Sequence, residues 1–290
     1  MSIEVVRTLP EDVWRRFVDE HPQGNIFHTP EMFHVFAHAK GYRPELWAAV
    51  NDREQVLVLL SVVQVTLLGG LPRRLTTRAI AYGSVLCVAG SQGETALAML
   101  LQAYKEEVRG KVLFTELRNL ADLSYLQPVL DHTGFAYEDH LNYLIDLDRS
   151  PEAVLQSIGQ RTRKKIRHAL RQAEVVVDEI EQPKQVAVCY DLLRKTYAAA
   201  GVPLADRSLF EAAFGVLHPQ GMVKFLLARI GDCYAAGSVE LVYKDTIYGW
   251  YGGMDRAYSD HIPNEVLLWH VFRWGAENGC QPGSGRSMYS

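Results

Sequence analysis

The sequence predicts an α+β protein in which one layered arrangement of strands and helices occurs twice. In both halves, helical segments precede a run of strands, and a further helix follows them. Short polar turns such as Gly231-Asp232 and Lys244-Asp245 join successive strands, which indicates mostly antiparallel sheets. At 290 residues, with 48% apolar and 22% charged residues, the chain has the length and composition of two soluble globular domains. We place these domains at residues 1–148 and 149–290.

The first half is expected to begin with a strand at Ile3 to Val6 and an amphipathic helix that starts at Pro10. A second helix follows Thr29-Pro30 and stops at Gly41. The later segments are predicted in the order hairpin (Glu45 to Val50 and Val56 to Leu68), strand (Ala79 to Val88), helix (Ala96 to Val108), strand (Lys111 to Arg118), helix (Leu120 to His132) and extended segment (Leu141 to Leu147).

The second half repeats much of this order. Its predicted elements are helices at about Lys184 to Ala200 and Arg207 to Leu217, then strands at Met222 to Ile230, Cys233 to Tyr243 and Thr246 to Gly252. A strongly apolar helix follows, with Asn264 as its expected N-cap and Gly279 at the position of a left-handed C-cap. A strand, a polar loop and a buried helix together form a common frame for a ligand pocket.

Composition and motifs exclude several classes of function. The net charge of −4 argues against general affinity for DNA, although a local basic patch remains compatible with phosphate binding. The N-terminus lacks the pattern of a signal peptide, and the longest apolar run is too short to span a bilayer, so we expect a soluble, cytoplasmic protein. Four distant cysteines and the isolated pair His34 and His38 do not make a metal site. No nucleotide loop, dinucleotide fingerprint or serine-hydrolase elbow occurs, so no bound cofactor is expected.

A cluster of positive charge is the sharpest feature of the sequence. On a helix, these residues would lie opposite a buried stripe of Ile158, Thr162, Ile166 and Leu170. An ordinary solvated helix face is one interpretation. The other is contact with a polyanion such as a tRNA backbone, a diphosphate or anionic lipid headgroups, because like charges repel each other until an anion relieves them. The cluster consists of Arg161, Arg163, Lys164, Lys165, Arg167 and Arg171.

The loop before the last helix contains the candidates for acid–base chemistry. Asp255 and His261 are potential proton acceptors, and Tyr251 and Tyr258 are potential hydrogen-bond donors to a substrate. The alternative interpretation is that the aromatic residues belong to the core or to cross-strand pairs, and that His261 is structural or solvated.

Six segments, in order, carry a resemblance to a known family. Together they resemble the FemAB-like acyltransferases, relatives of the GCN5-type N-acetyltransferases that contain two copies of that fold in one chain. The resemblance extends over nearly the whole chain, to about Cys280. The segments are GNIFHTPEMF, AYGSVL, TELRN, RTRKKIRHALRQAEV, YGGMDRAYSD and PNEVLLWHVFRWGAENGC.

The resemblance implies two tandem acetyltransferase-like domains and transfer of an acyl or aminoacyl group to an amine. The donor would be aminoacyl-tRNA or an acyl-CoA. The acceptor would be an amine such as one on a lipid-linked peptidoglycan or other cell-envelope precursor, with peripheral contact at the inner membrane surface. By position, the family's basic helix corresponds to Arg163, Lys164, Lys165 and Arg167. Its aromatic strand and the entry to its last helix correspond to Tyr251, Asp255, Pro263 and Asn264.

The end of the chain departs from the family pattern. Pro282, Gly283 and Gly285 predict that no strand follows the last helix, so the second domain is expected to be truncated at its C-terminal end or completed by strands from elsewhere. Two alternatives to aminoacyl transfer therefore stay open. One is an acyl-CoA-dependent N-acyltransferase, and the other is a non-catalytic protein that binds an anionic lipid or a tRNA.

Overall fold

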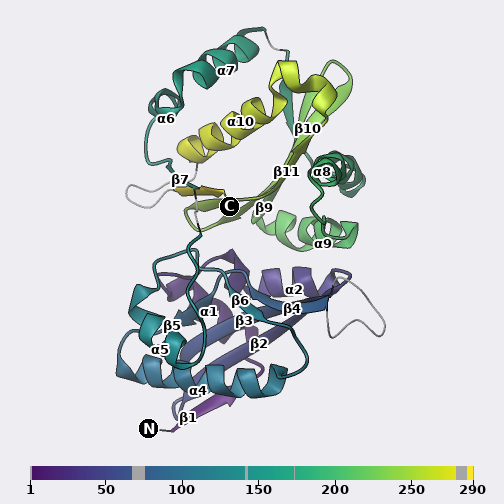
Figure 1. Ribbon diagram of the computed structural model, residues 1–290. Coiled ribbons are helices and arrows are strands. Elements are labelled where there is room, and N and C mark those ends of the chain that lie inside the picture. The colour runs from purple at the N-terminus through teal and green to yellow at the C-terminus, as the bar shows by residue number, and fades with distance from the viewer. Residues whose placement is uncertain (1, 67–75, 141–142, 173, 279–285, 290) are drawn as a thin grey trace. The chain divides into compact units, whose positions relative to one another are not determined.

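The computed structural model describes residues 2–66, 76–140, 143–172, 174–278 and 286–289, and the chain divides into two compact units, Met1–His140 and Leu141–Ser290 (Figure 1). Both contain helices packed on a sheet whose neighbouring strands are mostly antiparallel, which confirms the predicted fold class. The division falls earlier than the expected boundary after residue 148.

The first unit is built on a six-stranded sheet with the order β1-β2-β3-β4-β6, in which β5 also pairs with β3. Ala79 to Val88, expected as one strand, forms β4 and β5 because a turn with Ser84 at φ +65° separates them. Of the segment Leu120 to His132, expected as one helix, only Gln127–His132 forms an α-helix. The elements are β1 (Ile3–Val6), α1 (Glu11–Glu20), η1 (Ile26–His28), α2 (Pro30–His38), β2 (Tyr42–Asn51), β3 (Val56–Thr66), β4 (Thr77–Ala81), β5 (Val85–Cys87), α4 (Ser91–Val108), β6 (Thr115–Leu117), η2 (Ser124–Leu126) and α5 (Gln127–His132).

The second unit contains a six-stranded sheet with the order β7-β12-β11-β10-β9-β8. In Figure 1, α10 lies on one face of this sheet and α8 and α9 lie on the other. The elements are β7 (Tyr143–Asp146), α6 (Pro151–Ser157), α7 (Gln160–Gln172), β8 (Val176–Glu179), η3 (Pro183–Gln185), α8 (Val186–Ala200), α9 (Arg207–Leu217), η4 (His218–Gln220), β9 (Val223–Ile230), β10 (Cys233–Tyr243), β11 (Thr246–Met254), η5 (Arg256–His261), α10 (Pro263–Asn278) and β12 (Arg286–Tyr289).

The two units share one order of elements. In each, a first strand and two helices precede three consecutive antiparallel strands, and a helix then connects to a strand that pairs in parallel. The parallel pairs are β4 with β6 in the first unit and β11 with β12 in the second. The helical crossovers are α4 and α10, as parallel pairing requires.

The expectation that no strand follows the last helix is wrong. β12 pairs in parallel with β11 and in antiparallel fashion with β7. The strand β7, which precedes α6 in the chain, is therefore the edge strand of this sheet, next to β12. This pairing also explains the earlier domain division, because β7 belongs to the second sheet. The predicted breakers Pro282, Gly283 and Gly285, the expected cap Gly279 and the cysteine Cys280 lie outside the described residues.

The core beneath α10 positions the site. Val266, Trp269 and Phe272 of α10 pack with Leu226 and Ala228 of β9, and the cluster extends to α6 and α7. Gly275 allows α10 to approach the sheet closely, since a Cβ there would lie 2.6 Å from Leu147 Cδ1 and 2.8 Å from Ile247 Cδ1. The helix and its N-terminal turn are therefore held firmly against the strands.

Candidate active site in the second unit

The basic helix α7 exists because an apolar stripe binds it to the core. Ile166 and Ala169 are buried, and Ile158 packs beside them from the end of α6. Leu170, expected in the buried stripe, is 45% exposed instead, because Ala169 takes the inward position. Apart from Leu170, the exposed surface of the helix is polar.

α6 engages two of the predicted phosphate-binding residues. Arg167 forms an ion pair with Glu152, and Arg163 Nη1 donates a hydrogen bond to the Gln156 carbonyl oxygen at 2.6 Å. Lys164 and Lys165 are exposed, and no acidic partner lies within 4.0 Å of either among the described residues. The lysines are therefore the members of this set that remain available to an anion.

The turn before α10 has an unusual backbone. Asp255 caps η5 by accepting a hydrogen bond from the Ala257 N–H at 3.1 Å, and η5 ends at Ile262 with φ +50°. A β-branched residue rarely adopts that conformation, but the Ile262 side chain is buried in the core, which holds it there. The helix then starts at Pro263, a residue suited to the first helical position, so Asn264 is not the N-cap as expected.

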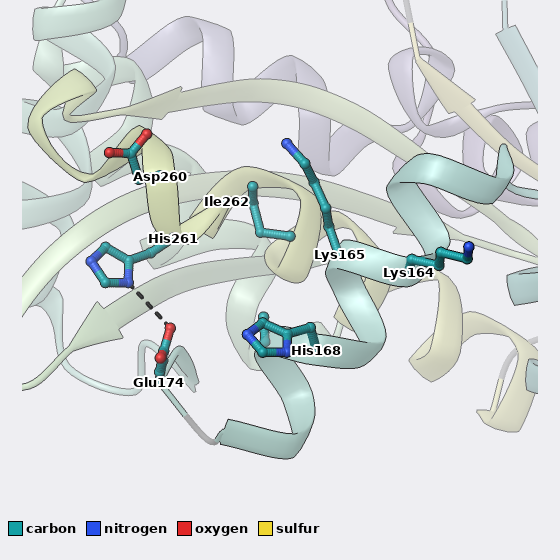
Figure 2. A pocket seen from close by; sticks show the side chains of 8 residues that line it. Lys164, Lys165, His168, Glu174, Asp260, His261 and Ile262 are labelled. Carbon is teal, nitrogen blue, oxygen red and sulfur yellow. Dashed lines mark hydrogen bonds and ion pairs between the residues drawn. The ribbon is translucent and has the colours of Figure 1, made fainter.

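A cavity of about 270 Å³ lies between α7 and this turn (Figure 2). It opens beside the N-terminus of α10, where free backbone N–H groups and the helix dipole favour negative charge. Two lysines and two carboxylates balance each other around it. The lining residues are Lys164, Lys165, His168 and Ala169 of α7, Glu174, and Asp260, His261 and Ile262 of the turn.

His261 is the predicted catalytic residue that lies in this cavity. Its Nδ1 lies 3.3 Å from Glu174 Oε2, the contact drawn in Figure 2. A carboxylate at one ring nitrogen orients the imidazole and leaves Nε2 to exchange a proton with a substrate. The pair thus has the arrangement of a general base and the group that orients it.

Asp255 has a different environment. Lys195 Nζ of α8 lies 2.6 Å from Asp255 Oδ2. That hydrogen bond, with the one from the Ala257 N–H, holds the pKa of the Asp255 carboxyl below its usual range. A carboxylate stabilised in this way accepts a proton poorly, so its geometry fits capping of η5 better than base catalysis.

The side chains of the remaining candidates do not line the cavity. The Tyr251 ring packs 5.9 Å from that of Tyr197 and 4.8 Å from that of Phe210, on the sheet face covered by α8 and α9. Tyr258 lies beside Cys233, whose hydrogen bond raises the pKa of the phenol. Asn264 is exposed in the first turn of α10. The structure therefore brings together His261, Lys164 and Lys165, and not Tyr251, Tyr258 or Asp255.

Sequence reasoning missed three polar residues of the cavity. His168 follows Lys164 by four residues, a spacing that places both on one side of a helix, so this residue was recognisable from the pattern. Glu174 and Asp260 had no such signal, because their approach depends on how the segments after α7 and β11 fold. Within the described part of the chain, no group of three potential metal ligands occurs and no helix has the length and apolarity to cross a bilayer.

Comparison with known families places this site in a recognised domain. Residues 157–282, fewer than half of the chain, match the model of the acetyltransferase (GNAT) domain. This segment contains α7, Glu174, the turn at η5 and α10, and hence the whole cavity. A search of curated proteins gave no match.

Solved structures show the same fold over both units. FemX superimposes with a TM-score of 0.70 at 15% identity, over 100% of this chain and 88% of that chain. A tandem GNAT protein from the clavulanic acid biosynthesis pathway gives 0.58 at 11%, over 99% and 89%. The C-terminal domain of an Agrobacterium fabrum protein described as a lysylphosphatidylglycerol synthetase gives 0.52 at 11%, over 96% and 75%. The chain therefore has the fold of FemX and of a tandem GNAT protein, and residues 157–282 match the acetyltransferase (GNAT) domain model.

Proposed function

We propose that the protein transfers an acyl or aminoacyl group to an amine at the cavity between α7 and α10. The observation that carries the proposal is the meeting of His261, Glu174 and two lysines at the N-terminus of α10, inside the segment that matches the GNAT domain. Aminoacyl-tRNA and acyl-CoA are the donors to be considered, since both present phosphates that Lys164 and Lys165 would bind. The acceptor would be an amine of a cell-envelope precursor.

The residues suggest a role for each group in the reaction. An amine attacks a carbonyl carbon only when it is neutral, so His261 would take its proton while Glu174 keeps the imidazole oriented. Attack forms the new C–N bond and places negative charge on the carbonyl oxygen. The backbone N–H groups of the first turn of α10, at Asn264 and Glu265, lack intrahelical partners and are suited to stabilise that oxygen. Collapse of the intermediate then breaks the bond between the carbonyl carbon and the donor's oxygen or sulfur, which takes the proton from His261 and leaves as an alcohol or a thiol.

We propose an envelope acceptor from the names of two structural neighbours. FemX gives the highest TM-score of the structures compared above. The Agrobacterium fabrum protein is described as a lysylphosphatidylglycerol synthetase. Both likenesses lie below 25% identity and support the fold alone. The acceptor therefore remains part of the proposal.

A transfer assay tests the reaction. Purified protein is incubated with labelled aminoacyl-tRNA or with acyl-CoA, and with amine acceptors that include a lysine-containing peptidoglycan precursor. We expect His261→Ala to lower kcat by about 10²- to 10⁴-fold, the usual contribution of a general base, with an unchanged melting temperature. His132→Ala, on the exposed surface of the first unit, is the control. Full activity of His261→Ala, or no transfer from either donor, would refute the proposal.

A further inference from the structure

A second cavity in the same unit has a lining of a different kind. It measures about 380 Å³, within the lower range of small-ligand sites. Its lining is almost wholly apolar; Tyr143, Thr162 and Glu265 also contribute to it. We call it the apolar groove, and its apolar lining consists of Ile145 of β7, Ile158, Ile166 of α7, and Leu268, Trp269 and Phe272 of α10.

This lining selects for hydrocarbon. Apolar cavities of such size offer water no hydrogen-bonding partners, so an apolar ligand gains free energy by filling them. Ile166 and Trp269 are buried, whereas Ile145, Ile158 and Leu268 are half-buried, so the groove reaches from the core toward solvent. Tyr143, which is 69% exposed, stands on the edge strand β7 with its ring available at the entrance.

The helix that lines one side of the groove also carries positive charges, and these indicate the other end of the ligand. The helix that contributes Thr162 and Ile166 also carries Arg161, Lys164 and Lys165 on its exposed surface. Among the described residues, these three cations have no acidic partner within 4.0 Å. Lysine and arginine side chains without acidic partners attract the surface of an anionic membrane, where an aromatic residue such as Tyr143 also fits the interface.

We propose that the apolar groove binds one alkyl chain of an anionic membrane lipid, whose charged headgroup contacts the basic side of α7. The headgroup would contact Lys164 and Lys165, which the proposed function assigns to donor phosphates. The apolar groove shares no lining residue with the first cavity, so its occupation by an alkyl chain is tested independently of the transfer reaction. Of the possible occupants, a membrane lipid is the one that uses the apolar lining, the unpaired cations and the exposed Tyr143 together.

A binding series with single-chain probes tests the groove. Octyl, decyl and dodecyl phosphate are titrated below their critical micelle concentrations, and the fluorescence of Trp269 in the groove reports binding. Each buried methylene should raise the affinity about fourfold. Leu268→Gln should lower the affinity for dodecyl phosphate at least about tenfold, because it places an amide in the groove. Leu170→Gln, the same change at an exposed position of α7, should have no effect.

Vesicles and a soluble thioester distinguish the source of the chain. The protein should sediment with phosphatidylcholine vesicles that contain phosphatidylglycerol and not with pure phosphatidylcholine, and Leu268→Gln should weaken the sedimentation. Ile158→Gln serves as a second variant if Leu268→Gln does not fold. Affinity that is independent of chain length would overturn the proposal. Binding of dodecanoyl-CoA without vesicle binding would also overturn it, because the groove would then bind a soluble donor. A dimer in gel filtration that Leu268→Gln dissociates would overturn it as well, because a second copy of the chain would then occupy the groove.

Discussion

A buried carboxyl group should make the stability of the second unit depend on pH. Glu240 lies on the central strand β10 and is 2% exposed, and its Oε2 has no hydrogen-bond partner among the described residues. Lys224 is its register partner on β9, but the Lys224 ammonium lies 2.9 Å from both carboxylate oxygens of Glu179 and 4.4 Å from the Trp274 ring centre. Burial therefore raises the pKa of Glu240 to about 7, and the neighbouring Ser238 side chain opposes part of the effect.

The size of the effect follows from this pKa. The pKa of Glu240 rises from an ordinary 4.5 in the unfolded chain to about 7 in the folded protein. At about 1.4 kcal/mol per pKa unit, ionising this carboxyl group costs roughly 3 kcal/mol more in the folded state than in the unfolded state. Because the pKa of Glu240 is raised in the folded state, the contribution of this group to the free energy of unfolding is fully present below about pH 4.5. It is lost progressively as the pH rises and is gone above about pH 7.

The substitution Glu240→Gln tests this reasoning, since it keeps the shape and removes the charge. The free energy of unfolding in urea should be similar for the wild type and the variant at about pH 4.5, and higher for the variant by about 3 kcal/mol at about pH 8. Glu181→Gln, at an exposed position, should leave the pH dependence unchanged. A difference between wild type and Glu240→Gln that stays constant over this range, or that favours the wild type at about pH 8, would refute the argument.

The other predictions concern packing and anion binding. Gly275→Ala should lower the free energy of unfolding by about 1 to 3 kcal/mol, because its Cβ would lie 2.6 and 2.8 Å from two aliphatic side chains. Gly215→Ala, in α9 with nothing within 4 Å of the new Cβ, should instead raise it by up to about 1 kcal/mol; equal effects in chemical unfolding would contradict this reading. Lys164→Ala combined with Lys165→Ala should weaken pyrophosphate binding and reduce its salt dependence in calorimetry, at an unchanged melting temperature. Arg161→Ala, on the same helix and outside the cavity, should leave pyrophosphate binding unchanged. Equal losses of affinity in both variants would show that binding depends on the total positive charge of α7 and not on the cavity.

Much of the fold was predictable because periodicity and turns are local. The strands β9, β10 and β11 and the helices α8, α9 and α10 lie where the apolar patterns and the Gly231-Asp232 and Lys244-Asp245 turns placed them. The expected strand at Ala79 to Val88 missed a turn, because Ser84 adopts a positive φ that is uncommon for a non-glycine residue. The expected Asn264 cap was displaced because Pro263 starts the helix after the buried Ile262.

The candidate site was predictable in part. The sequence pointed to the basic helix and to the loop before α10, and it named His261, Lys164 and Lys165. It could not separate these residues from Tyr251 and Asp255, since the side of a sheet on which a side chain lies depends on register. In β11 the pairing shifts by one residue at Val239/Glu240 of the partner strand, and such an irregularity leaves no clear trace in the pattern.

The sequence by itself determined the repeated order of elements, the amphipathic basic helix and the apolar character of α10, because each depends on residues close together in the chain. Only the tertiary structure decided that Arg167 pairs with Glu152, that Glu174 meets His261, and that β7 joins β12 at the edge of the second sheet. These contacts join residues from separate segments, and their geometry follows from packing of the whole unit and not from any local preference.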